Sequence, residues 1–293
     1  MLVATAALVL SPGSALAKKK HKKPNRLGAV VTVTAIGNVV SGTGSASTAV
    51  ANCPAGTRVF GGGFSLAQGD PQTTAVFESY RSAPGSWTVS VLTSGPNSGA
   101  AAAYGYCRKS AKAITEVTAS SPVAIGLGQP GSASASCPAG TRLVAGGFQS
   151  TSTPGTKFVS LPQTSMSSSP STWSVASVNN GAQSQTLTAH AYCLSGIRAP
   201  TVVSAETSAT LSQDQTLTAT SSACPIPPKP KKGKKKRPRQ LLSAGGFSTP
   251  ARTTQPFVLF TSSLAGPSGW TATADSITPT PGAFSVTSQG ICV

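Results

Sequence analysis

The chain has 293 residues, of which 5% are aromatic and 10% are charged. Six acidic residues and two histidines leave few groups for proton transfer or metal binding, which disfavours most enzyme classes. The formal charge is +17, but fourteen of the 23 lysines and arginines lie in two short tracts. The composition therefore indicates near-neutral folded modules that carry two basic extensions, rather than a basic folded surface.

Residues 1–17 contain a short apolar run, then Pro12 and Gly13, and end in Ala15-Leu16-Ala17, a pattern typical of a signal peptide. The run is too short to span a bilayer, so we expect no membrane span. No lysine or arginine precedes the run and five lysines follow it, which is unusual for an export signal. Residues 18–28 are basic, have nothing to bury, and are expected to be a disordered linker.

The block at 53–64, which begins Cys-Pro-Ala-Gly and ends Gly-Gly-Phe, organises the rest of the chain. It recurs at 137–148 and again, split open, at 224–247. From Cys to Phe is 11 positions in the first two copies and 23 in the third. Self-similarity at a fixed period predicts three structural repeats, and the third carries a basic insertion at 227–240. We place the repeats at 29–111, 112–198 and 199–293.

Each repeat contains two cysteines, 54, 56 and 68 positions apart, and pairing within each repeat is the economical arrangement. Closing loops of this length restricts the unfolded chain by roughly 4 kcal/mol each on the entropy model. Three disulfides also favour an oxidising compartment, so we expect a secreted, extracellular protein, with wall association as an open alternative. The cysteines are Cys53, Cys107, Cys137, Cys193, Cys224 and Cys292.

Every repeat begins with a β-branched run, at 29–34, 114–118 and 201–204, which predicts a strand. Pro at the second and Gly at the fourth position of Cys-Pro-Ala-Gly favour a turn between two antiparallel strands. The Gly-Gly-Phe that follows predicts a strand whose glycines permit a bulge or a close approach, with Phe in the core. No segment keeps a helical period, and Gly and Pro interrupt the chain throughout. The fold class is therefore all-β, with three disulfide-stapled, antiparallel, sandwich-like repeats, either in tandem or around a pseudo-threefold axis.

Three tryptophans, Trp87, Trp173 and Trp270, alternate with apolar and polar residues, which places them on a buried strand face rather than on a sugar-binding platform. Small residues share the face of each second cysteine. Tyr104 and Tyr106 lie on the opposite face of their strand and remain candidates for a ligand site.

A catalytic site built into every repeat should recur, and none does. The six acids stand at different offsets from their cysteines, and His190 corresponds to Tyr104 and to a glutamine in the other copies. No Cys-x-x-Cys spacing suggests a metal site. We predict no enzyme activity, no catalytic residue, no cofactor and no metal.

The basic insertion differs from the other copies in kind, because a low-complexity run of Lys, Arg and Pro has no folding purpose. Its cations could neutralise an anionic cell-wall polymer such as teichoic acid, a nucleic acid or an acidic lipid surface. A tolerated, solvated loop is the alternative. The candidate residues are Lys229, Lys231, Lys232, Lys234, Lys235, Lys236, Arg237 and Arg239.

The recurring Cys-Pro-Ala-Gly-Thr-Arg, Gly-Gly-Phe, Trp and Tyr-Cys pattern resembles secreted repeat proteins of high-GC Gram-positive bacteria, a family that implies no established activity. A weaker resemblance is to vitelline membrane outer layer protein I, whose threefold β-prism repeats carry Cys-Pro-x-Gly followed by Gly-Phe. That second resemblance implies architecture only. The sequence thus predicts a non-enzymatic envelope or matrix protein for structure or adhesion, which binds anionic polymers through its basic tracts. A lectin-like carbohydrate-binding module is the alternative, and a hydrolase is the third.

Overall fold

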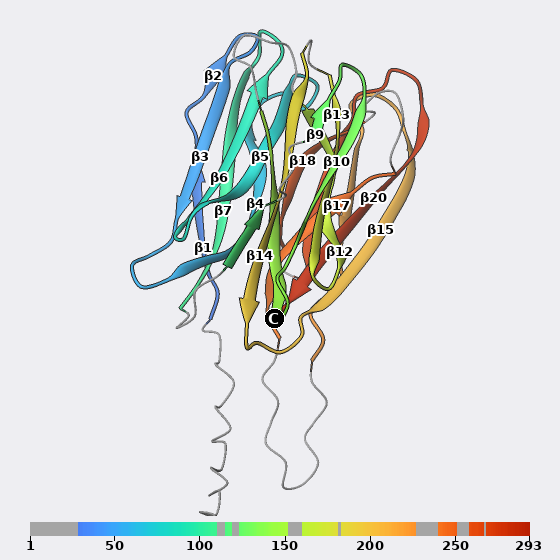
Figure 1. Ribbon diagram of the computed structural model, residues 1–293. Helices are drawn as coiled ribbons and strands as arrows, with labels where there is room; N and C mark the ends of the chain where they lie inside the picture. Colours follow the sequence, from blue (N-terminus) through green and yellow to red (C-terminus); the bar gives the residue numbers. More distant parts are fainter. Residues whose placement is uncertain are drawn as a thin grey trace, which may run out of the picture.

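The computed structural model describes residues 29–109, 115–118, 123–151, 160–180, 183–226, 240–250, 258–266 and 268–293. The expected signal peptide, the basic linker and residues 227–239 of the insertion lie outside these ranges. The described residues form twenty β-strands and no helix, which confirms the all-β prediction (Figure 1). Strand formation follows from the alternation of apolar and polar residues and from the Val and Thr content, since β-branched side chains fit a pleated, half-buried surface.

The strands fall into three groups that follow the three repeats. Repeat 1 contributes β1 (Val31–Ile36), β2 (Val40–Ser41), β3 (Ala46–Asn52), β4 (Arg58–Gln68), β5 (Thr74–Ala83), β6 (Ser86–Thr93) and β7 (Ser98–Arg108). Repeat 2 contributes β8 (Thr115–Thr118), β9 (Val123–Ile125), β10 (Pro130–Ser136), β11 (Thr141–Ser150), β12 (Ser160–Ser169), β13 (Thr172–Asn179) and β14 (Gln185–Ser195). Repeat 3 contributes β15 (Thr201–Leu211), β16 (Thr216–Thr220), β17 (Leu242–Ser248), β18 (Val258–Ala265), β19 (Trp270–Ser276) and β20 (Gly282–Cys292).

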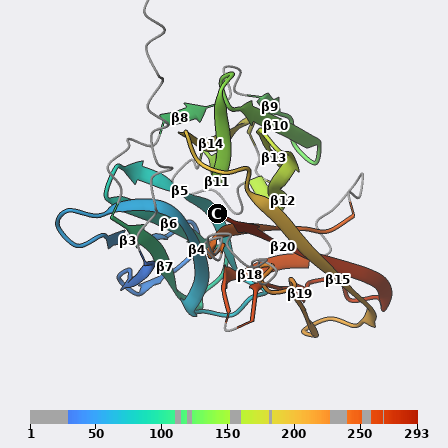
Figure 2. The ribbon, with the colours of Figure 1, turned by 90° about the horizontal axis from the view of Figure 1, so that it is seen from below.

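The strands make three antiparallel sheets, and every sheet joins two repeats. Their orders are β1-β7-β4-β18-β19-β16, β10-β13-β12-β17-β20-β15 and β3-β6-β5-β11-β14-β8. In addition, β2 pairs with β7 and β9 pairs with β14. Each repeat therefore divides its strands between two sheets, and the repeats are joined by the pairs β4–β18, β5–β11 and β12–β17. Seen along the strands, the three repeats surround a common axis (Figure 2). Of the two arrangements left open by the sequence, the pseudo-threefold body is the one observed, and we call each junction between repeats a seam.

The Cys-Pro-Ala-Gly turn forms, but its register and its role differ from the prediction. The amide of Thr57 donates to the carbonyl of Pro54 at 3.0 Å, so Pro occupies the first position and Gly56, with φ of 76°, the third. Repeat 2 repeats this geometry at Gly140, whose φ is 80°. The prediction that the turn joins two paired strands was wrong, because β3 and β4 belong to different sheets. Glycine is needed here since its backbone tolerates positive φ.

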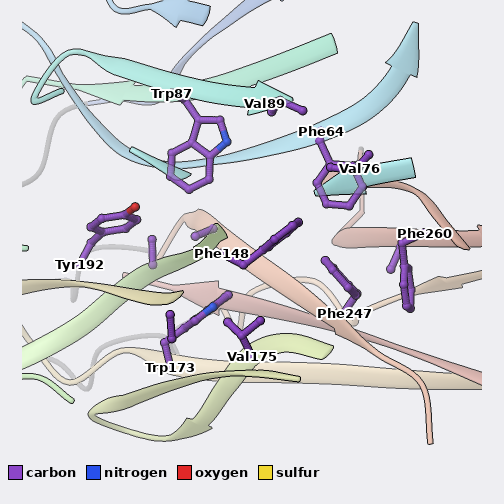
Figure 3. Packing of buried hydrophobic residues seen from close by; sticks show 14 of the residues in the cluster. Phe64, Val76, Trp87, Val89, Phe148, Trp173, Val175, Tyr192, Phe247 and Phe260 are labelled. Carbon is purple, nitrogen blue, oxygen red and sulfur yellow. The ribbon is translucent and has the colours of Figure 1, made fainter. Parts of the chain in front are cut away.

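The Gly-Gly-Phe segment builds the centre of the molecule, as predicted. The side chains of Phe64, Phe148 and Phe247 meet edge to face, with ring centroids 5.6 to 6.0 Å apart (Figure 3). A Cβ at Gly62, Gly146 or Gly245 would overlap the tryptophan of the same repeat. The next glycine in each copy lies against a serine carbonyl of the neighbouring repeat. The motif thus sets both the packing inside each repeat and the close approach between repeats.

The tryptophans lie in the core, as the alternation predicted. Trp87, Trp173 and Trp270 are each 1% exposed. Each indole Nε1 donates to a serine in its own repeat, at 3.1, 3.0 and 2.8 Å, so that its one polar group is satisfied. The cavity between these rings holds only about 10 Å³, enough for no more than a single water molecule. The tryptophans therefore stabilise the fold and leave no room for a ligand at the axis.

Candidate functional site: the cystine end of the prism

In each repeat the second cysteine of the disulfide lies near the end of the last strand, β7, β14 or β20. We call the end of the molecule where these three strands end the cystine end, and it is the lower end in Figure 1. Cys53 pairs with Cys107, Cys137 with Cys193 and Cys224 with Cys292, the pairing within repeats that the sequence predicted. Contacts between repeats at this end include a hydrogen bond of 3.2 Å from Ser243 Oγ to the carbonyl of Val144. The three disulfides, one in each repeat, thus lie at the same end of the molecule.

The described cations gather at the cystine end. Arg58 pairs with Arg108 at the start of β4, and Lys109 follows β7 directly. Arg142 occupies the same position in repeat 2 that Arg58 has in repeat 1, and Arg198 precedes β15, whose Thr201 pairs with Cys292. Arg81 lies near the β5–β6 turn, where the carbonyl of Gly85 accepts the amide of Cys53 at 2.8 Å. The six lysines and arginines of the described part of the chain therefore share one end.

Acidic residues have a different distribution. Asp70 follows the far end of β4, and its neighbour Gln72 donates through Nε2 to the carbonyl of Ser276 at 2.9 Å. Asp214 and Asp275 lie at this same far end, where the amide of Asp214 donates to the carbonyl of Ser276. Glu78 and Glu206 stand midway along β5 and β15, and Glu116 in β8 is the one acid among the described residues that is paired close to a cystine. The described residues carry equal numbers of positive and negative charges. The positive charges lie at the cystine end, whereas most of the negative charges lie midway along the strands or at the far end.

Both basic tracts join the body at the cystine end. Val31 in β1 pairs with Cys107, and Arg26 of the N-terminal tract precedes Ala29 by three residues, a span of at most about 11 Å. The insertion leaves the described chain after Ile226, close to Cys224, and returns at Gln240. The side-chain Nε2 of Gln240 donates to the carbonyl of Ala199 at 3.2 Å. Fourteen further positive charges of the sequence are therefore tethered to the end that already holds the body's cations.

The last residue of the predicted insertion, 227–240, contacts the folded body. Gln240 is 7% exposed and its Oε1 accepts a hydrogen bond of 2.9 Å from Thr201. It belongs to the folded body because its amide side chain caps the start of β15. The eight candidate cations between 229 and 239 lie outside the described residues, so their binding role stays a prediction.

Arg108 and Arg81 are the two buried cations among the described residues of the cystine end, and Arg108 is the more buried. It is 1% exposed, its Nη2 lies 3.3 Å from the carbonyl of Leu241, and its guanidinium lies 5.7 Å from the ring centroid of Phe60. Its Nε has no hydrogen-bond partner among the described residues. Burial lowers the pKa of the Arg108 guanidinium to about 10, so it remains cationic at neutral pH. It joins repeat 1 to repeat 3 rather than facing a ligand.

The tyrosines proposed as ligand contacts divide into two cases. Tyr106 is 4% exposed, and its hydroxyl accepts a hydrogen bond of 2.7 Å from the amide of Ala265 across the seam with repeat 3. Burial raises the pKa of the Tyr106 phenol well above its ordinary value, and the Ala265 amide offsets only part of this rise. Tyr104 is half-buried, and its hydroxyl lies 3.1 Å from Ser65 Oγ. The ring of Tyr106 is therefore part of the seam.

His190 also has a packing role. It is 5% exposed and stacks on Tyr80, with centroids 5.1 Å apart and an interplanar angle of 20°. The residues that the structure describes contain no group of three or more potential metal ligands. No helix among them is long and apolar enough to cross a membrane.

The charge polarity of the body was not predicted, because the two basic tracts were compared with the rest of the chain and the remaining charges were not assigned to either end. A usable indication was present. Arg58, Arg142 and Arg198 each follow a cysteine by five positions, and Arg108 and Lys109 follow one directly. Once the disulfides are known to lie at one end, a cation that is close in sequence to a cysteine can be assigned to that same end.

Taken together, the sheets and cystines define a disulfide-stapled all-β protein of three repeats that share their sheets. No protein-family model matches the chain, and no curated protein matches its sequence at a significant level. The resemblance to secreted repeat proteins of high-GC Gram-positive bacteria, and the weaker one to vitelline membrane outer layer protein I, therefore stay predictions.

Proposed function

We propose that this is a non-enzymatic, secreted envelope or matrix protein that binds phosphate-rich anionic polymers at its cystine end. The observation that carries the proposal is the convergence of both basic tracts on the end where the body's cations gather. Twenty of the 23 lysines and arginines belong to the tracts or to this end. Concentrating positive charge on one surface raises the local potential and favours contact with polyanions.

The disulfides support the compartment. Three cystines persist in an oxidising environment, which fits an extracellular protein, and wall association would place it beside teichoic acids. Lysine and arginine on low-complexity segments bind phosphates without sequence readout, so the expected specificity is for charge density. The lectin alternative loses one of its two tyrosines, because the ring of Tyr106 is buried in a seam.

The test compares the full chain with a variant in which residues 229–239 are replaced by a Gly/Ser segment of equal length. Binding to purified teichoic acid and to duplex DNA is measured by fluorescence anisotropy over a range of salt concentrations. We expect weaker binding and a smaller slope of log K against log salt, by roughly 0.9 for each DNA phosphate that the variant no longer neutralises. Changing Arg58, Arg142 and Arg198 to Gln should reduce the slope further.

Asp214→Asn is the matched charge control. Asp214 is exposed at the far end and has φ of 63°, a conformation that Asn tolerates. This change also alters net charge, but away from the proposed surface, so its binding should stay close to that of the unchanged protein. Equal binding by the Gly/Ser variant, or an effect of Asp214→Asn as large as that of the cystine-end changes, would refute the proposal.

A further inference from the structure

The three seams are not equivalent, although the repeats place corresponding residues in each. In the seam between repeats 1 and 2, the Tyr192 ring packs against Trp87 with centroids 5.8 Å apart. The Arg81 guanidinium lies 4.9 Å from the centroid of the Tyr192 ring, and the Arg81 amide donates to the Tyr192 hydroxyl at 2.7 Å. A phenol and a guanidinium thus close this seam near the cystine end.

The seam between repeats 2 and 3 has smaller residues at both positions. Ile291 stands where Tyr192 stands in repeat 2, and Ser167 corresponds to Arg81. Gln289 replaces the tyrosine hydroxyl as the partner of the facing backbone. Its Oε1 accepts a hydrogen bond of 2.8 Å from the Ser167 amide, and its Nε2 donates to the Ser167 carbonyl at 3.1 Å. The backbone is therefore satisfied without a phenol.

A groove of about 310 Å³ opens at this seam between repeats 2 and 3. Its walls are apolar side chains of Leu143 and Pro170 from repeat 2 and of Pro200, Val202 and Ile291 from repeat 3. Ser167 and Thr201 complete the lining. Val202 is 43% exposed on the edge strand β15. The volume is at the lower end of the range for small-molecule sites.

The groove lies at the cationic end of the body. Its Thr201 pairs with Cys292, and its Pro200 is two residues after Arg198, so the two Cα atoms are at most about 7 Å apart. Arg198 is exposed. The acid on the same face of β15 is Glu206, which lies about 13 Å from Val202 along the strand, toward the far end. A negative group is therefore favoured at the Arg198 side of the groove and disfavoured at the other.

We propose that this groove binds the alkyl chain of a single-chain anionic amphiphile, with the charged head group beside Arg198. Apolar walls stabilise the chain by excluding water, and the cationic end complements the head. The charge part of this inference rests on the proposed function, whereas the apolar part rests on the seam alone. An amphiphile site would give the protein a second, lipid-like class of anionic ligand.

Dodecyl phosphate, used as a monomer below its micelle concentration, is a suitable probe, with binding to the full chain followed by isothermal titration calorimetry. Val202→Asp should weaken binding at least about tenfold, because it places a like charge on the groove wall. The matched control is Thr32→Asp, since Thr32 faces Tyr106 in β1 as Val202 faces Ile291 in β15. The control should stay within about twofold of the unchanged protein.

The double variant Ser167→Arg with Ile291→Tyr introduces the two residues of the closed seam and should abolish binding, and a melting curve checks that it folds. Dodecyl maltoside, which has the same chain and a neutral head, should bind at least about tenfold more weakly than dodecyl phosphate. Absence of dodecyl phosphate binding, or an equal weakening by Val202→Asp and Thr32→Asp, would overturn the inference. DNA binding by Val202→Asp should keep its salt slope, so failure of the groove and failure of the polymer surface are distinguishable.

Discussion

Removing the hydroxyl of Tyr106 tests whether hydrogen bonds across the seams hold the repeats together. In Tyr106→Phe the ring remains and can keep its edge-to-face contact with Trp270, whose centroid is 5.6 Å away. The change deletes only the acceptor of the Ala265 amide, which is 2.7 Å from the hydroxyl oxygen. The acceptor belongs to a buried side chain and the amide donor is part-buried. A buried donor left without its acceptor costs about 1–3 kcal/mol, so we expect a cost at the lower end of this range.

We expect the free energy of unfolding to fall by that amount, measured by guanidinium denaturation with the disulfides intact. The slope of the transition should not change, since the surface exposed on unfolding is the same. Tyr104→Phe is the control, because its hydroxyl contacts Ser65 in a half-buried position where water can replace the bond. That change should cost less than about 1 kcal/mol. If the two variants lowered the free energy of unfolding equally, the hydrogen bond across the seam would contribute no more to stability than the one within repeat 1.

Three further changes test other parts of the structure. Gly146→Ala should destabilise by about 1–3 kcal/mol or more because a methyl group would overlap the indole of Trp173, whereas Gly85→Ala, with open space around it, should be close to neutral in the same denaturation assay. Arg108→Met should keep or raise the free energy of unfolding, since it removes a buried cation that has no acidic partner among the described residues; a decrease above about 1 kcal/mol would contradict this. Above about pH 10 the Tyr106 phenol ionises in the unfolded chain but stays protonated in the folded one, so the folded state binds more protons and stability should fall with rising pH. Stability curves for Tyr106→Phe should lack that component.

Much of the fold could be predicted because the three copies of the repeat can be compared with one another. The cysteine spacing recurs three times and predicts the disulfide pairing, and the alternation after each tryptophan predicts its buried face. Gly-Gly-Phe predicts a close approach and a core residue, and the structure has both at Gly62 and Phe64. These features are local, so periodicity and residue size are enough to find them.

Sharing of sheets between repeats could not be predicted in the same way. Whether β4 pairs with β18 of another repeat depends on a few long-range contacts, among them Phe64 with Ser263, that have no local pattern. The Cys-Pro-Ala-Gly turn fits a hairpin as well as a crossing between sheets, and the hairpin prediction was wrong. The end that each cation occupies follows from this topology, so the polarity of the body was also hidden until the strands were placed.

The departures of repeat 3 from the other two meet at one place. Where Tyr106 and Tyr192 close their seams, repeat 3 has Ile291, and Gln289 takes over the hydrogen bond to the backbone. The same repeat opens the turn after Cys224, and the returning chain is anchored by Gln240 on Thr201, which also lines the groove. The other two seams lack both changes, so the threefold arrangement itself does not require them. Both changes fall at the cystine end, which is the end where we propose that ligands bind.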